Sequence, residues 1–170
     1  MSSVPPARPT AAAPFWHAMR GGRVYVDTNA FIYLLEGAPI YGDAVAELLA
    51  ASERHELFAC TGDAAHAELL VKPMRDGNSA GVGVIDALFA QARMLEVLPH
   101  DAKVFRLAAS LRASHRLRFI DALHLATALS QRCSHFVTND GDFSGVDGIK
   151  VILLSAVVLK SSLRKRRNSL

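Results

Sequence analysis

The sequence predicts an α/β fold of three layers, in which helices cover both faces of a central parallel sheet of four to five strands. Two observations carry this prediction. From residue 23 onward, short segments with β-branched or aromatic residues alternate with longer helical segments, and such alternation is typical of a parallel sheet. The chain has 170 residues and is 51% hydrophobic, which is enough for one domain with a substantial core.

The expected elements follow one another in a regular order. The strand segments are short, and most of them contain β-branched or aromatic residues. The segment 94–98 is the least distinct, because Met94-Leu-Glu96 could instead extend the helix before it. The expected strands are 23–26, 57–60, 94–98, 135–138 and 149–154. The expected helices are about 29–36, 40–54, 62–72, 80–92, 101–115 and 119–131.

The two ends of the chain differ from its body in composition and charge. Residues 1–22 are rich in Pro, Ala and Gly and predict a flexible extension, although Trp16 could dock onto the body. Residues 23–155 are the expected folded domain, and residues 156–170 a basic tail. Residues 24–159 carry 11 basic and 16 acidic side chains, a net charge of −5, whereas 160–170 carry five basic and no acidic ones. The tail could bind nucleic acid through phosphates, or it could be a solvated charge run.

The composition also indicates where the protein works. The longest apolar runs are too short to cross a bilayer, and prolines stand near the N-terminus where a signal peptide needs an apolar segment. We therefore expect a cytoplasmic protein without a membrane partner. Cys60 and Cys133 lie in separate segments without metal-ligand spacing, and buried thiols are favoured over a disulfide.

Four acidic residues lie in apolar segments, where an unpaired carboxylate is costly. Asp27 and Asp140 each follow a predicted strand, whereas Glu68 and Asp121 lie within predicted helices. Ligands bind beyond the carboxyl ends of strands in open α/β sheets, so we expect all four acids to meet at one edge. A turn residue that bonds its own backbone would explain one such Asp, but not the whole set.

The four acids predict a site for a hard divalent cation. We expect no basic residue at neighbouring helical spacing to neutralise Glu68 or Asp121. An oxygen-rich cluster without a charge partner suits Mg2+ or Mn2+. Some of the acids are expected to hold protons through raised pKa values when no cation is bound. Such a centre is typical of metal-assisted phosphoryl chemistry.

Around these acids the chain resembles the PIN-domain family of ribonucleases, and most closely the VapC-type toxins of type II toxin–antitoxin pairs. The match in order and spacing extends over about residues 23–155. The four segments that carry it are Val24-Tyr-Val-Asp-Thr-Asn-Ala-Phe-Ile-Tyr33, Ala67-Glu-Leu-Leu70, Asp121-Ala-Leu-His-Leu-Ala-Thr-Ala-Leu129 and Val137-Thr-Asn-Asp-Gly-Asp-Phe143.

The resemblance implies a three-layer PIN-like domain and an endoribonuclease that depends on one or two Mg2+ or Mn2+ ions. It assigns metal binding and catalysis to Asp27, Glu68, Asp121 and Asp140. Its supporting residues are Thr28, Asn29, Thr138 and Asp142, of which Asp142 is expected mainly to bond its own loop. It also implies an RNA substrate, a homodimer and a cognate antitoxin, and the apolar helix Ala30-Phe-Ile-Tyr-Leu-Leu35 helps to line the antitoxin groove in such proteins.

Other roles are less determined by the sequence. His124 lies three residues after Asp121, on the same helical side; it could orient an acid, but a satisfied core histidine is the favoured interpretation. Each expected phosphate contact could equally be a solvated surface residue. These contacts are Lys72, Arg75, Arg112, Arg116 and Arg118.

Three functions stay open: a toxin endoribonuclease, a PIN nuclease that processes RNA without an antitoxin, and a catalytically idle RNA-binding or scaffold module. The four intact acids argue against the idle module. A flavodoxin-like receiver domain also has acids at strand ends, but it has no place for Glu68 or for the helix that carries Asp121.

Overall fold

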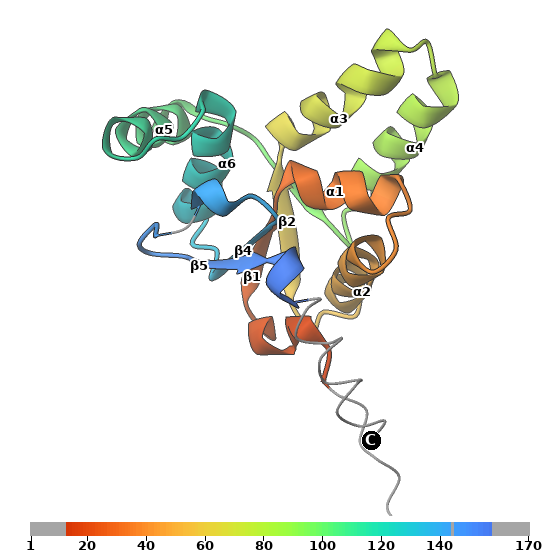
Figure 1. Cartoon of the computed structure of the whole chain (residues 1–170), viewed down its shortest axis with the longest axis horizontal. Helices are drawn as coiled ribbons and strands as arrows, with labels where there is room; N and C mark the ends of the chain where they lie inside the picture. Colours follow the sequence, from red (N-terminus) through yellow and green to blue (C-terminus); the bar gives the residue numbers. More distant parts are fainter. Residues whose placement is uncertain (1–12, 144, 158–170) are drawn as a thin grey trace, which may run out of the picture.

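The central sheet has five strands, all parallel, in the order β3-β2-β1-β4-β5. The computed structural model describes residues 13–143 and 145–157, and Figure 1 shows the sheet among its helices. The predicted α/β fold is confirmed, including the indistinct strand near residue 96. The strands are β1 (Arg23–Val26), β2 (Phe58–Gly62), β3 (Glu96–Leu98), β4 (His135–Thr138) and β5 (Lys150–Leu153).

The helices lie close to their predicted positions. The largest differences are at α3, which continues through Pro73 to Arg75 instead of ending at residue 72, and at α4, which ends at Phe89 instead of residue 92. Proline removes one backbone hydrogen bond without always ending a helix. The helices are α1 (Thr28–Leu35), α2 (Tyr41–Glu53), α3 (Asp63–Arg75), α4 (Ser79–Phe89), α5 (Ala102–Ser114) and α6 (Phe119–Ser130).

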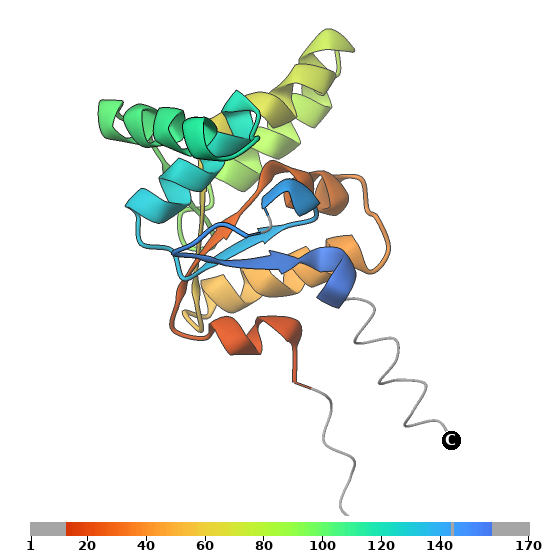
Figure 2. The same cartoon turned by 60° about the vertical axis from the view of Figure 1, so that its left-hand side comes forward.

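Two hydrophobic clusters cover the two faces of the sheet. Successive residues of a strand point to opposite faces, and in β1 the side chains of Val24 and Val26 belong to one cluster while Tyr25 belongs to the other. The first cluster contains buried residues of α1, α2, α3 and α4, and the second contains those of α5 and α6. Figure 2 shows helices on both sides of the strands. This arrangement explains why β1 is buried along nearly its whole length.

Within residues 1–22, the segment around Trp16 is packed onto the body, as the sequence allowed for Trp16. Phe15–Met19 form a 3-10 helix, and Trp16 and Met19 are buried in the first cluster. The guanidinium groups of Arg20 and Arg54 lie 5.9 and 6.0 Å from the centre of the Trp16 ring. This part of residues 1–22 is therefore packed onto the body, because leaving a large Trp side chain exposed to water is costly.

Other expectations for the chain have different outcomes. Cys60 and Cys133 are buried free thiols with their sulfurs 3.5 Å apart, as predicted. The basic tail prediction concerns residues that lie almost wholly outside the described ones. Within the described part, no helix is long and apolar enough to cross a membrane.

Candidate functional site

The four acids predicted from the sequence line one small cavity. Asp27 follows β1 and Asp140 follows β4, and these two strands are paired neighbours in the sheet. Glu68 reaches the same edge from α3 and Asp121 from α6. The cavity has a volume of about 170 Å3, and its lining residues are Asp27, Thr28, Asn29, Ile32, Glu68, Arg118, Asp121, His124 and Asp140.

Asp27 is the most thoroughly bonded of the four acids. It caps the N-terminus of α1, where its Oδ1 accepts a hydrogen bond from the Thr28 amide at 2.8 Å. Its Oδ2 accepts from Asn29 Nδ2 at 2.9 Å and from the Thr138 hydroxyl at 2.7 Å. Burial raises the pKa of Asp27, although the nearby His124 and the bonds from Thr138 and Thr28 oppose the shift. The expectation of a raised pKa therefore fits Asp27, and its largest cause is burial.

The loop after β4 is tied to α1 by the polar residues that follow the two strands. Asn29 Oδ1 accepts a hydrogen bond from the Asn139 amide at 3.0 Å. The Asp140 amide donates to the Thr138 hydroxyl at 3.1 Å, and the Asp142 amide donates to Asp140 Oδ1 at 2.9 Å. Asp142 thus contributes its backbone to the loop while its own side chain is exposed. These bonds hold Asp140 at the cavity.

Glu68 is held by donors from two other elements. The Thr28 hydroxyl donates to its Oε2 at 2.6 Å, and His124 Nε2 lies 2.8 Å from the same oxygen. The other ring nitrogen of His124 lies 2.8 Å from the Tyr25 hydroxyl. Burial opposes ionisation of Glu68, but the bonds from His124 and Thr28 lower its pKa on balance. The pKa of Glu68 is therefore lowered, whereas the pKa of Asp27 is raised.

The structure overturns the expectation that no basic residue neutralises Asp121. Arg118 precedes it by three residues and forms a bidentate pair, with Nε 2.7 Å from Oδ2 and Nη2 3.1 Å from Oδ1. Arg118 Nη2 also lies 3.8 Å from Asp140 Oδ2. Residues three apart on a helix are neighbours, so this pair was readable in the sequence. Lys72 stands four residues after Glu68 but pairs with Glu36 instead, at 3.9 Å.

The donor set of the cavity fits a hard divalent cation. As placed, the described acids and histidines do not form a ready-made group of three or more around one point. The positive charge at the cavity is instead the Arg118 guanidinium, which spans Asp121 and Asp140. Arg118 is 73% exposed, so its long side chain is free to turn outward. Carboxylates from four segments then face one small space, which is the donor chemistry that Mg2+ and Mn2+ prefer.

We propose that a divalent cation and the Arg118 guanidinium compete for the carboxylates of Asp121 and Asp140, and replacing Arg118 by glutamine tests this competition. We expect the Arg118→Gln variant to bind Mn2+ more tightly than the natural chain, because the cation no longer displaces a guanidinium from Asp121. Isothermal titration with Mn2+ measures the difference. Arg116→Gln is the matched control, since Arg116 is exposed and does not line the cavity. Equal affinities for all three proteins would contradict the proposed competition.

Arg118 is the one predicted phosphate contact that lines the acidic cavity. Lys72 and Arg75 pair with neighbouring acids at 3.9 and 3.5 Å, and Arg112 donates to the Leu117 carbonyl at 3.4 Å. The sequence interpretation also missed Tyr25, which occupies an ordinary strand position. The hydrogen bond between the Tyr25 hydroxyl and His124 on α6 depends on how β1 packs against α6, and no local sequence pattern predicts that packing.

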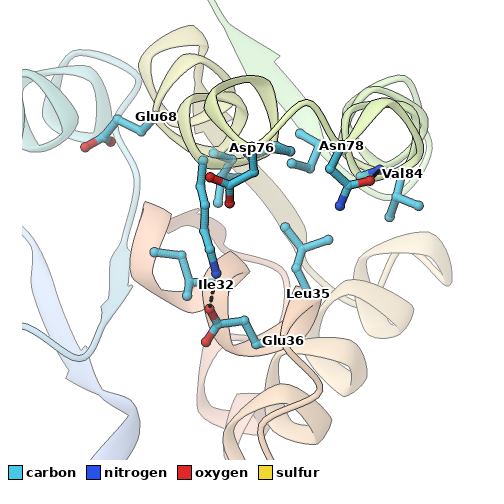
Figure 3. A pocket seen from close by; sticks show the side chains of 12 residues that line it. Ile32, Leu35, Glu36, Glu68, Asp76, Asn78 and Val84 are labelled. Carbon is cyan, nitrogen blue, oxygen red and sulfur yellow. Dashed lines mark hydrogen bonds and ion pairs between the residues drawn. The ribbon is translucent and has the colours of Figure 1, made fainter.

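A second, larger hollow adjoins the acids (Figure 3). It has a volume of about 390 Å3 and lies between α1, α3 and α4. Its walls are mainly apolar, with side chains such as Ile32, Leu35 and Val84, and the ion pair of Glu36 and Lys72 crosses it. Ile32 and Glu68 line both hollows. The apolar groove is therefore continuous with the acidic cavity.

The fold and the site together define an α/β domain with an acid-lined cavity at the carboxyl edge of a parallel sheet. The chain belongs to the PIN domain family, whose family model matches residues 24–149. A comparison with curated proteins finds no match.

Solved structures with the same fold include several toxin–antitoxin proteins. The chain is similar to VapBC2 of Rickettsia felis bound to a promoter DNA fragment (17% identity, TM-score 0.62, 77% of this chain and 98% of that one). It is similar to DNA-bound VapBC of Salmonella typhimurium (19% identity, TM-score 0.63, 78% and 98%). It is also similar to VapC20 of Mycobacterium tuberculosis, a toxin that cleaves the sarcin–ricin loop (18% identity, TM-score 0.59, 75% and 98%).

Proposed function

We propose that this protein is a Mg2+- or Mn2+-dependent endoribonuclease and the toxin of a type II toxin–antitoxin pair. One observation carries the proposal: four acids from four separate segments line a single cavity of about 170 Å3. Burying Asp27 and Asp121 to 5% and 6% exposure is costly for a fold that does not use them. The membership in the PIN domain family and the similarity to VapC structures support the same function.

The geometry suggests a role for each part of the site. A bound divalent cation supplies activation of water and neutralisation of the charge that develops on the phosphoryl group. Asp27, Glu68, Asp121 and Asp140 would hold it. Thr138 and Asn29 keep the Asp27 carboxylate in one orientation through their hydrogen bonds. Attack by water on the phosphodiester leaves a 5′-phosphate and a 3′-hydroxyl.

Arg118 is the proposed contact for the substrate phosphate. In the structure its guanidinium lies at the mouth of the cavity, paired with Asp121 and near Asp140. A cation bound by these acids would release it, and a guanidinium binds phosphate oxygens well. The same side chain would thus balance the charge of the acids before metal binding and that of the RNA afterwards.

The apolar groove is the proposed site for the antitoxin. It runs from Val84 on α4 past Ile32 on α1, and it opens into the acidic cavity at Glu68. A partner helix with apolar side chains fits such a groove, and an arginine at its end could reach the acids. The Rickettsia felis and Salmonella typhimurium structures are toxin–antitoxin complexes, which supports a partner of this kind.

A homodimer is also proposed. Phe105 on α5 and Phe119 on α6 are 44% and 49% exposed, and their rings stack with centres 6.3 Å apart. Val71 and Met74 on α3 are exposed as well. Exposed apolar side chains are typical of protein interfaces, and these two pairs are separate candidates for the contact between two copies.

Expression in a bacterial host tests the toxin function. We expect the natural protein alone to arrest growth and the Asp27→Ala variant to permit it, because this change removes a proposed metal ligand. Growth is followed after induction, with both proteins adjusted to equal soluble levels. Equal growth of the two strains would favour a PIN nuclease that processes RNA without an antitoxin.

The neighbouring reading frame distinguishes these two functions further. A short upstream frame encoding a DNA-binding protein, whose co-expression restores growth, is the result expected for a toxin. A nuclease without an antitoxin would lack such a neighbour but would still cleave RNA. The idle RNA-binding module would have no such neighbour and would cleave no RNA.

A further inference from the structure

A chain of buried polar groups leads from the core of the protein to Glu68. The Tyr25 hydroxyl lies 2.8 Å from His124 Nδ1, and His124 Nε2 lies 2.8 Å from Glu68 Oε2. Tyr25 is fully buried and His124 is 1% exposed. The backbone of Gly62 packs closely against the Tyr25 hydroxyl, since a Cβ at this position would lie only 2.9 Å from it. The positions of Tyr25 and His124 are thus determined by the packing around them.

The hydrogen-bond partners determine where the protons lie. A phenol hydroxyl donates readily to an imidazole nitrogen, so Tyr25 donates to His124 Nδ1. The ring N–H then lies at Nε2, where it points at the Glu68 carboxylate. The opposite tautomer would set a nitrogen lone pair against a carboxylate oxygen, which is repulsive. The Glu68 carboxylate therefore favours the tautomer with the proton at Nε2, and the bond from Tyr25 to Nδ1 stabilises the same tautomer.

The two oxygens of Glu68 consequently differ. Its Oε2 accepts from both the Thr28 hydroxyl and His124. Among the described residues, no hydrogen-bond partner is found for Oε1. A glutamate side chain has several rotatable bonds, and holding one oxygen removes most of its freedom before a ligand arrives.

We propose that Tyr25 and His124 are positioning residues that hold Glu68 by Oε2 and leave Oε1 as the oxygen for the cation. This inference rests on the proposed metal site and adds its outer shell. Groups that orient a metal ligand typically change metal affinity or activity by about 10- to 100-fold when they are removed. Ordinary core packing would not need two buried polar side chains in series.

Tyr25→Phe in the full chain is the first test, because it removes one oxygen and keeps the ring. Tyr41→Phe is the control, since Tyr41 packs against Tyr33 away from this chain of groups. We expect Mn2+ binding, measured by isothermal titration without RNA, to weaken by about tenfold or more in Tyr25→Phe alone. Nitrogen-15 NMR of the His124 ring, without metal, should report the proton at Nε2 in the natural protein and a larger share of the Nδ1–H tautomer in Tyr25→Phe.

A second pair of variants separates positioning from packing. His124→Gln can still donate an N–H to Glu68, whereas His124→Leu fills the core without a donor. We expect His124→Gln to retain more Mn2+ affinity than His124→Leu, although leucine suits a buried position better. A packing role predicts the reverse order. Thermal unfolding confirms that each variant is folded.

The outcomes distinguish this inference from the proposed function. Unchanged Mn2+ affinity and an unchanged His124 tautomer in Tyr25→Phe would overturn the inference and leave the nuclease proposal standing. If Tyr25→Phe binds Mn2+ more weakly than the natural protein, but the natural protein cleaves no RNA, the inference is supported and the nuclease function is overturned. A natural protein that binds no Mn2+ would overturn both.

Discussion

Replacing Asp121 by asparagine is expected to lower the rate of RNA cleavage by at least about a hundredfold, the scale of losing one preorganised transition-state stabiliser. Asparagine keeps the shape of the side chain but removes its negative charge. Asp121 is 6% exposed and lines the acidic cavity, so little solvent is near it to take the place of the lost carboxylate. The measurement is the initial rate of cleavage by purified protein at saturating RNA and Mn2+.

The matched control is Asp43→Asn, on the first turn of α2, where the carboxylate is exposed and outside the cavity. We expect it to cleave RNA at the rate of the natural protein. Circular dichroism and thermal unfolding establish that Asp121→Asn is folded. Near-normal cleavage by folded Asp121→Asn would contradict the assignment of this acid. Asp27→Asn should lose activity on the same scale.

Removing divalent cations is expected to stop cleavage completely, and restoring Mg2+ or Mn2+ to recover it. The physical reason is that the acids alone supply neither an activated water nor positive charge for the phosphate. The same ions should stabilise the fold, because a ligand at a hundredfold excess over its Kd adds about 2.7 kcal/mol to the free energy of unfolding. The rate in chelator and the shift of the unfolding midpoint measure the two effects.

The Asp121→Asn variant serves as the control for the stability effect. Its unfolding midpoint should respond much less to Mn2+ than that of the natural chain. Cleavage that continues in chelator, with no shift of the midpoint on adding Mn2+, would contradict a metal-dependent site. Cleavage that needs the metal without any shift would place the ion on the RNA instead.

The sheet and its helices were predictable because the signals that define them are local. Arg23–Val26 and His135–Thr138 are short, mostly buried and flanked by residues that begin turns or helices, so their pattern marks them as strands. The 3-10 helix Phe15–Met19 was not predicted, since it lies in a segment rich in Pro and Ala. Its order comes from burying Trp16 against the body, a tertiary effect.

The candidate site was predictable to the extent that topology determines it. Asp27 and Asp140 follow strands that turned out to be neighbours, so their meeting at one edge needed only a parallel sheet. The Arg118–Asp121 pair was equally predictable, because Arg118 immediately precedes α6 and stands three residues before Asp121. The bond between Tyr25 and His124 was not accessible, because it depends on the rotation of α6 against β1. Local patterns thus locate the acids of the cavity better than the groups that form hydrogen bonds with them.

Chemical mapping of the ends of cleaved RNA tests the central claim most directly. Purified natural protein with Mn2+ should release fragments that carry a 5′-phosphate and a 3′-hydroxyl, because water is the attacking group. Asp121→Asn, prepared in the same way, should release almost none. Fragments that end in a cyclic 2′,3′-phosphate, or equal amounts of any fragment from Asp121→Asn, would contradict a metal-dependent nuclease centred on these four acids.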